Sequence, residues 1–319
     1  MDRNLALEAV RVTEAAALAA SSWMGRGDER GADGAAVEAM RQALNGLNID
    51  GAVVIGEGER DQAPMLYVGE KVGAGAGPAL DVALDPLEGT TITAKGGNNA
   101  IACIALATRG RLLHAPDVYM EKIAVGAGPG MDKVSLDAAP ADNLRALAAA
   151  RDTDVADLVV CVLDRPRHRR LIEEVRAAGA RIMQISDGDV GAVIATAQPS
   201  SGIDIYLGSG GAPEGVLGAA ALRCIGGRMQ GRLVFRNDDE VRRARACGID
   251  DLDRVYDLVD LAAGDDVMFA ATGVTDGAML RGVRRFAHAA ETHSIVMRSR
   301  SGTVREVHAR HNLARKPRE

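Results

Sequence analysis

Residues 157–226 alternate apolar runs with segments of helical periodicity, and this order constrains the fold more than any other feature of the chain. The runs have the length and the Val, Ile and Leu content of buried strands: 157–164, 181–186 and 203–208. A helical segment follows each run: 169–178, 189–197 and 213–226. Such alternation predicts a parallel sheet with right-handed crossovers. The C-terminal part of the chain is therefore expected to be α/β.

The first part of the chain mixes helices and strands without that alternation. Helical periodicity covers two segments, 5–20 and 34–47. Asp33 stands at the expected N-cap position of the second helix. Short apolar runs predict strands at 52–56 and 80–84. Residues 100–116 are typical of a hairpin that turns at Arg109 and Gly110, so we expect an α+β arrangement here.

A change in composition separates these two parts. Glycine and proline cluster at 128–140, which is typical of a linker. We therefore expect an N-terminal domain over 1–133 and a C-terminal domain over 134–319. Beyond residue 230 the patterns weaken, although 266–273 and 292–299 are typical of further strands.

Composition excludes several classes of protein. The net charge of −6 argues against a nucleic-acid-binding surface, which is usually basic. No apolar run approaches the ~20 residues that span a bilayer. Glu8, Arg11 and Glu14 interrupt the first helix, so it lacks the core of a secretory leader. The 4 cysteines form no C-x-x-C pair and are typical of reduced thiols. We expect a soluble cytoplasmic protein that binds neither nucleic acid nor a membrane.

Carboxylates recur just after predicted strands or at predicted helix starts. They are Asp33, Glu57, Asp85, Glu88 and Glu214. Functional residues of α/β sheets gather beyond the carboxyl ends of strands. Acids brought to such an edge can bind hard divalent cations such as Mg²⁺ and Mn²⁺, which prefer oxygen ligands. Taken alone, Asp33 or Glu214 is more typical of a helix cap, and Glu57 is more typical of a solvated loop.

The stretch "LDVALDPLEGTT", residues 80–91, is harder to explain by capping alone. Asp85 and Glu88 follow an apolar run, with a proline between them that stiffens the turn. Gly89 allows the backbone to approach a ligand closely. If residues 89–91 open a helical turn, their N–H groups face an anion. The stretch therefore indicates a site for both cations and an anion.

This motif resembles the metal site of the lithium-sensitive, metal-dependent sugar and inositol phosphatases. Longer stretches are similar to the class II (GlpX-type) fructose-1,6-bisphosphatases, in the same order from about residue 3 to residue 312: "GRGD…ADGAAVEAMR", "VVIGEGERDQAPMLYVGEKVG", "DPLEGTT", "RPRH", "DGDV", "GGAPEG" and "ATGVTDG". The resemblance implies a layered αβαβα sandwich of the sugar phosphatase type. It also implies a homodimer or homotetramer that acts on a sugar bisphosphate in gluconeogenesis.

The resemblance further implies roles for individual residues. The five acids listed above match the metal carboxylates of the family, with two or more Mg²⁺ or Mn²⁺ ions per site. Thr90, Glu57 and Asp85 match its catalytic positions. The substrate positions that match are Glu88, Gly89, Thr90, Tyr119, Arg165, Pro166, Arg167, Asp187, Gly188, Asp189 and Gly211.

The residues themselves support part of this substrate set. Arg165 and Arg167 follow a strand, and guanidinium groups bind phosphate bidentately. With His168 they predict an anion pocket, although "RPRHRR" is also typical of a solvated basic run. Acids at 187 and 189 suit sugar hydroxyls or helix capping equally. Tyr119 alone is more typical of packing, so its role rests on the resemblance.

The expected reaction is hydrolysis of the 1-phosphate of fructose 1,6-bisphosphate. Sedoheptulose 1,7-bisphosphate or an inositol phosphate is an alternative substrate, and a non-catalytic sugar-phosphate sensor is an alternative function. "GSGGAP" suggests a nucleotide-binding oxidoreductase, but Pro213 stands where that fingerprint needs glycine or alanine. The chain departs from the family at Glu29, where a lysine is usual, and at Ser209, where an aliphatic residue is usual.

Overall fold

The computed structural model describes residues 1, 4–58 and 64–315, which form two compact units. Unit 1 contains Met1–Arg111 and Gly264–Glu319, and unit 2 contains Leu112–Ala263. The sequence suggested a single division at 133/134. The chain instead returns to unit 1 after residue 263, because the strands that follow pair with strands of the first sheet. Residues 59–63, which belong to one of the quoted stretches, lie outside the described residues.

Unit 1 is built on an 8-stranded sheet with the order β12-β13-β11-β4-β3-β1-β2, to which β14 adds beside β13. Its strands are β1 (Asp50–Ile55), β2 (Lys71–Val72), β3 (Ala79–Glu88), β4 (Ile101–Thr108), β11 (Val267–Gly273), β12 (Arg284–Arg285), β13 (Ala289–Arg298) and β14 (Thr303–Asn312). Only the pairing of β1 with β3 is parallel among the pairs described. The expected strands at 52–56, 266–273 and 292–299 are confirmed, and the strand expected at 80–84 is part of the longer β3.

The hairpin expected at Arg109 and Gly110 is wrong. β4 pairs with β3 on one side and with β11 on the other. It is therefore a central strand, and it is buried along almost its whole length. Residues after Arg111 belong to unit 2, where Leu112 forms an isolated bridge with Ala262. The apolar run that continues past Gly110 therefore did not predict the strand pairing, because a partner of β4 comes from a distant part of the chain.

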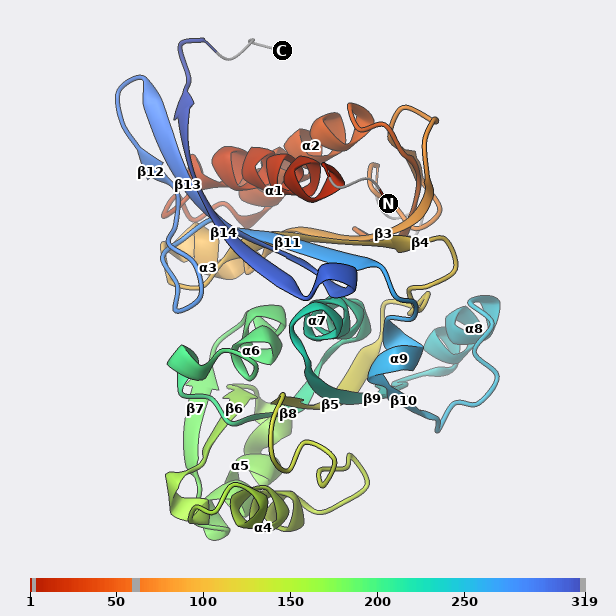
Figure 1. Cartoon of the computed structure of the whole chain (residues 1–319), viewed down its shortest axis with the longest axis vertical. Helices are drawn as coiled ribbons and strands as arrows, with labels where there is room; N and C mark the ends of the chain where they lie inside the picture. Colours follow the sequence, from red (N-terminus) through yellow and green to blue (C-terminus); the bar gives the residue numbers. More distant parts are fainter. Residues whose placement is uncertain (2–3, 59–63, 316–319) are drawn as a thin grey trace. The chain divides into compact units, whose positions relative to one another are not determined.

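Two long helices cover one face of the unit 1 sheet (Figure 1). Helix α1 (Leu5–Ser21) confirms the first predicted helix. Helix α2 (Glu29–Asn45) begins earlier than expected, because the Asp28 side chain accepts the Gly31 N–H at 2.9 Å and so caps the helix. Asp33 is therefore not the N-cap. Glu29 lies in the first turn, where the helix dipole favours an acid.

Unit 2 contains a 6-stranded mixed sheet with the order β10-β9-β5-β8-β6-β7. Its strands are β5 (Tyr119–Gly126), β6 (Val159–Leu163), β7 (Arg181–Ile185), β8 (Ile205–Gly211), β9 (Gly227–Val234) and β10 (Val255–Asp257). The predicted parallel part is confirmed, because β6 pairs parallel with both β7 and β8. β5 inserts antiparallel between β8 and β9, so the whole sheet is mixed rather than parallel.

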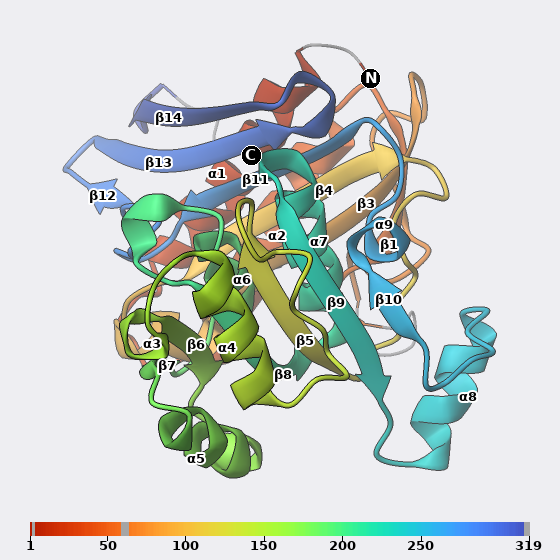
Figure 2. The same cartoon turned by 60° about the horizontal axis from the view of Figure 1, so that its bottom comes forward.

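Helices cover both faces of the unit 2 sheet (Figure 1). The helices of this unit are α4 (Pro140–Ala150), α5 (Arg169–Ala177), α6 (Asp189–Ala195), α7 (Ala212–Ile225), α8 (Asp238–Ala246) and α9 (Leu258–Leu261). Side chains of α4 and α5 share a core with Ile123 and Val125 of β5. α6 and α7 approach the other face, where Lys122 lies. Figure 2 shows β10 and α8 at the margin of the unit.

Each unit combines helices with a mixed sheet, which confirms the expected α/β class. No helix in the described part of the chain is long and apolar enough to cross a membrane.

A chain of buried hydroxyls joins α1 to the unit 1 sheet. Thr13 Oγ1 and Thr272 Oγ1 are 2.7 Å apart, and Thr272 Oγ1 and Ser294 Oγ are 2.8 Å apart. All three side chains are fully buried. The hydroxyl of Thr272 therefore satisfies polar atoms of both neighbours.

We expect Thr272→Val to lower the free energy of unfolding by about 1–3 kcal/mol, because Thr13 and Ser294 lose a shared buried partner. Urea titration of the purified protein measures this change. Thr303→Val, at an exposed hydroxyl of β14, is the matched control and should change stability little. An equal effect of both substitutions would contradict a stabilising role for the buried hydroxyls of Thr13, Thr272 and Ser294.

Candidate active site

The end of β3 brings Asp85 and Glu88 to the same place. Residues three apart on a regular strand point to opposite faces. The pairing of β3 with β4 shifts between Asp85 and Glu88, however, as in a β-bulge. The two carboxylates consequently offer oxygens within 4.8 Å of each other. Our expectation that the strand ends at residue 84 is wrong, because β3 includes the motif as far as Glu88.

The turn after β3 has the geometry that the motif predicted. Gly89 has a φ of 94°, and a Cβ there would lie 3.1 Å from Ile92 Cδ1, so a side chain would be strained. It is the N-cap of the short helix α3 (Thr90–Lys95). Thr93 donates its hydroxyl to Gly89 O at 3.1 Å and fixes the turn. Thr90 begins the helix and is half-buried beside the two acids.

Two further acids lie close to Asp85 in unit 1. Burial, together with the carboxylates of Asp85 and Asp33, raises the pKa of Glu57 to about 8. Burial also raises the pKa of Asp33. Asp33 comes from α2, Glu57 follows β1, and Asp85 lies in β3. Elements separated in sequence therefore bring three acids within electrostatic reach of one another.

This acidic group fits divalent cations. Carboxylates that are buried together repel one another and favour either a proton or a bound cation. The high pKa of Glu57 reflects its burial and, after that, this repulsion. The available donors are carboxylate oxygens of Asp33, Glu57, Asp85 and Glu88, the ligand type that Mg²⁺ and Mn²⁺ prefer. The chemistry of the donor set therefore agrees with the predicted cofactors.

Glu214 belongs to unit 2 and lies in the first turn of α7. That helix begins at Ala212, one residue before the expected Pro213. The N-cap is Gly211, and a Cβ on it would lie 1.9 Å from Glu214 Oε2. Gly211 thus leaves the space in which the carboxylate lies. The role of Glu214 as a metal ligand stays a prediction.

Three of the predicted substrate residues meet in unit 2. Tyr119 pairs with Gly211 across β5 and β8. The guanidinium of Arg167 lies over the Tyr119 ring, 4.7 Å from its centroid. Arg167 also donates from Nε and Nη2 to Ser209 O, at 3.0 and 2.7 Å. Arg167 is therefore held by a ring and a carbonyl oxygen, and neither neutralises its charge.

Arg165 and Asp187 form a second group. Pro166 starts a 3₁₀ turn (Pro166–His168) directly after Arg165, and Arg165 Nη2 lies 3.8 Å from Asp187 Oδ1. Gly188 has a φ of 88° and is the N-cap of α6. Both charged side chains are only half-buried, so they remain accessible to a ligand.

Asp189 differs from Asp187, because it is buried and paired inside unit 2. Its carboxylate accepts from Lys122 Nζ, and Tyr206 OH lies 3.5 Å from Oδ2. A Cβ on Gly210 would lie 2.2 Å from the same oxygen. The side chain makes no cap hydrogen bond at the start of α6. Its contact with sugar hydroxyls stays a prediction, and its partners in the structure are Lys122 and Tyr206.

His168 does not contribute charge to an anion pocket, contrary to our expectation. Its Nδ1 contacts Leu163 O at 2.7 Å, and its Nε2 accepts the Ser209 N–H at 2.8 Å. Because a carbonyl can only accept, Nδ1 carries the proton and the ring is neutral. Burial also lowers the pKa of His168. The ring instead fixes Ser209, whose carbonyl oxygen binds Arg167.

Sequence reasoning missed two charged residues near this group. Lys122 lies in β5 and is 1% exposed. A lysine among the apolar residues of a strand was the sequence feature that could have marked it. Arg236 follows β9, and its guanidinium lies 4.8 Å from the Tyr119 centroid. No local pattern marked Arg236, because the contact with Tyr119 joins strands that are distant in sequence.

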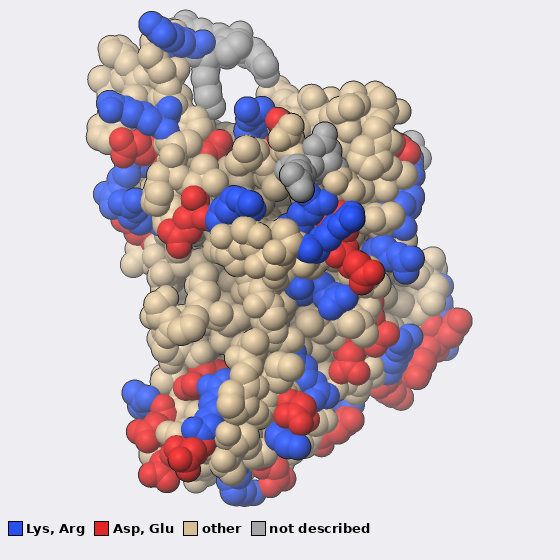
Figure 3. Space-filling model, viewed as in Figure 1, with Lys and Arg blue, Asp and Glu red and all other residues tan. Residues whose placement is uncertain are grey.

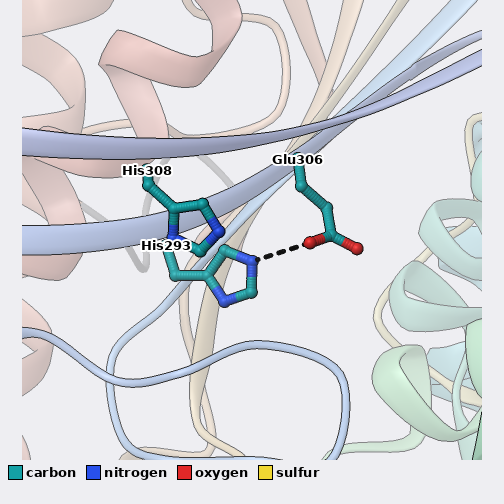
Figure 4. A group of neighbouring side chains, drawn as sticks. All are labelled: His293, Glu306 and His308. Carbon is teal, nitrogen blue, oxygen red and sulfur yellow. Dashed lines mark ion pairs between the residues drawn. The ribbon is translucent and has the colours of Figure 1, made fainter.

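A second group of potential metal ligands lies on β13 and β14. His293, Glu306 and His308 offer ligand atoms within 4.8 Å of one another (Figure 4). His293 Nδ1 accepts the Arg281 N–H at 3.0 Å, so its Nε2 carries a proton and faces Glu306 Oε2 at 3.4 Å. A metal-ligating nitrogen is unprotonated. The two rings also stack, with centroids 4.2 Å apart. The protonated Nε2 of His293 therefore fits a contact with Glu306 better than a bond to a metal.

Charges are mixed over the face of the molecule that Figure 3 shows. Lysines and arginines are interspersed with aspartates and glutamates. That face therefore offers no continuous basic surface of the kind that nucleic acids need.

The high pKa of Glu57 predicts a pH effect on the metal-free protein. Between the ordinary value of 4.5 and about 8, folded Glu57 holds a proton that the unfolded chain has lost, so stability falls as pH rises. We expect Glu57→Gln to raise the melting temperature in chelator more at about pH 8.5 than at about pH 5. Exposed Glu38→Gln is the control. The same shift at both pH values would contradict the prediction.

Comparison with known proteins agrees with these observations. Residues 3–311 match the family described as bacterial fructose-1,6-bisphosphatase, glpX-encoded. Fructose-1,6-bisphosphatase 1 class 2 of Escherichia coli (strain K12) is 48% identical, over 99% of this chain and 97% of the relative. Fructose-1,6-bisphosphatase class 2 of Shigella flexneri is 48% identical with the same coverage. The chain therefore belongs to the glpX-encoded family of bacterial fructose-1,6-bisphosphatases.

Proposed function

We propose that this chain hydrolyses the 1-phosphate of fructose 1,6-bisphosphate and releases fructose 6-phosphate and inorganic phosphate. The observation that carries the proposal is the convergence of Asp33, Glu57 and Asp85 in unit 1, beside a turn that begins at Gly89. Such a group of acids next to backbone N–H groups suits a metal-bound phosphate. Family membership supplies the substrate.

The proposed metal ligands are the acids named from the sequence: Asp33, Glu57, Asp85, Glu88 and Glu214. When two or more Mg²⁺ or Mn²⁺ ions are bound, they supply Lewis-acid stabilisation of the phosphoryl oxygens and a water of lowered pKa. The raised pKa of Glu57 supports the proposal, because metal and proton compete for that carboxylate.

Residues around the turn orient the reaction. The Thr90 hydroxyl and the Glu57 carboxylate hold the attacking water in line with the leaving oxygen. The N–H groups of residues 89–91 stabilise negative charge as it spreads over the phosphoryl group. Water is the nucleophile, because the motifs contain no cysteine and His168 is the one histidine among them, with both nitrogens bonded in the described structure.

The phosphate that is not hydrolysed binds in unit 2. Tyr119, Arg165 and Arg167 recognise it, since guanidinium groups match phosphate oxygens bidentately. The segment Asp187–Gly188–Asp189 and Gly211 contact the sugar. We place the reaction in gluconeogenesis, in the cytoplasm, with the chain as a homodimer or homotetramer.

Loss of a metal carboxylate tests the proposal. We expect Asp85→Ala to lower kcat on fructose 1,6-bisphosphate by about 10³-fold or more, because several kcal/mol of transition-state stabilisation disappear. Phosphate release at saturating Mg²⁺ measures the effect, with Glu38→Gln on the outside of α2 as the control. Near-wild-type turnover of Asp85→Ala would show that the assignment is wrong.

A substrate panel tests specificity. We expect wild-type protein with Mn²⁺ to release phosphate faster from fructose 1,6-bisphosphate than from sedoheptulose 1,7-bisphosphate or inositol 1-phosphate. Preference for inositol 1-phosphate, which has no second phosphate, would contradict the role of Arg165 and Arg167. Absence of metal-dependent turnover on every compound would favour a sensor.

A further inference from the structure

A cavity of about 540 Å³ in unit 2 adjoins the predicted binding site for the remote phosphate. Its lining includes Tyr119, Arg167, Ser209 and Arg236, together with apolar side chains. Tyr119 and Arg167 were expected from the sequence to bind phosphate. Arg236 was not, and it belongs to none of the motifs that identified the family.

Tyr119 is the meeting point of two guanidinium groups. Arg167 lies 4.7 Å and Arg236 lies 4.8 Å from the centroid of its ring. β9 pairs with β5 so that Val234 is opposite Tyr119, and this register brings Arg236 to the ring two residues later. Cation–π contacts attract each guanidinium to the ring, but two like charges beside one ring also repel.

A buried carboxylate holds Arg236 in this position. Glu240 of α8 is 1% exposed and accepts both the backbone N–H of Arg236, at 2.7 Å, and its Nε, at 2.6 Å. Its own N–H is bound by Asn237 Oδ1 at 3.0 Å. Although burial raises the pKa of Glu240, the bonds from Arg236 lower it below the ordinary value. Glu240 therefore stays charged and fixes the guanidinium from one side.

Charges near Tyr119 leave room for an anion. Glu240 pairs with Arg236, whereas Arg167 is bonded to the Ser209 carbonyl oxygen. Glu121, also in the lining, lies 3.8 Å from Arg232. Among the hydrogen bonds of the described residues, Arg236 Nη1 has no partner. The wall therefore presents donors of two arginines, with Glu121 in the lining and with Glu240 and Asp117 as further carboxylates that attract Arg236.

We propose that Arg236 is a further binding residue for the remote phosphate of the sugar bisphosphate and that Glu240 is its positioning residue. The inference rests on the proposed function and extends it. Arg167, bonded to Ser209 O of β8, and Arg236, which follows β9, both contact the Tyr119 ring, so they can approach one phosphate together. A dianionic group relieves the repulsion between the guanidiniums, so the site favours sugar bisphosphates over monophosphates that lack the remote group.

Substitution of Arg236 in the full-length protein tests the inference. We expect Arg236→Ala to raise KM for fructose 1,6-bisphosphate about tenfold or more, with the loss in KM rather than kcat. The ratio of kcat/KM between fructose 1,6-bisphosphate and fructose 1-phosphate should fall by a similar factor. Arg232→Ala, at an arginine of β9 that pairs with Glu121 and Asp137, is the matched control and should preserve that ratio.

Glu240→Gln separates positioning from binding. It keeps Arg236 but weakens the bond to Nε, so we expect a smaller rise in KM and a correspondingly smaller fall in the substrate ratio. Equal losses on both substrates would indicate a structural role and overturn the inference. An unchanged KM in Arg236→Ala would also overturn it.

Calorimetric titration with fructose 6-phosphate distinguishes this inference from the proposed function. The product carries the remote phosphate, so Arg236→Ala should weaken its binding about tenfold whether or not the enzyme turns over. Wild-type protein that binds fructose 6-phosphate but does not hydrolyse the bisphosphate would refute only the proposed function. Equal affinity of wild type and Arg236→Ala, or no binding by wild type, would refute the role of Arg236.

Discussion

Repulsion between buried carboxylates is the interaction on which the site in unit 1 depends. Asp33, Glu57 and Asp85 come from α2, the end of β1 and β3, and burial together with the charges of Asp85 and Asp33 raises the pKa of Glu57 to about 8. An apolar core under α1 and α2 holds these elements in place despite that repulsion. The fold thus keeps a group of acids ready for cations, at some cost to the stability of the metal-free protein.

In unit 2, by contrast, buried charged groups are paired with partners of opposite charge. Lys122 and Asp189 neutralise each other inside the unit, and His168 is a neutral ring with both nitrogens bonded. The guanidinium groups of Arg167 and Arg236, which contact the Tyr119 ring, are among the charges left accessible. Buried groups that are already neutralised, together with accessible cations, suit the recognition of a phosphate. Only the accessible cations gain a new partner when the phosphate binds.

Much of the site followed from residue types in the sequence. The motif at 80–91 indicated a strand, a tight turn and paired acids, and all three are present. The strand–helix alternation after residue 157 indicated the parallel strands of unit 2. Predictions from local sequence patterns failed where strand pairing depends on segments that are distant in the sequence. The hairpin at Arg109 was wrong because β11 supplies the second neighbour of β4.

The sequence by itself determined which elements form and which chemical groups they carry. Periodicity, glycine at positive φ and carboxylate chemistry act over a few residues, so they can be read along the chain. Tertiary structure alone decided the protonation of Glu57 and His168 and the meeting of Arg236 with Tyr119. Each of these depends on burial or on contacts between groups that are distant in the sequence. They can be predicted only when the folded positions of those groups are known.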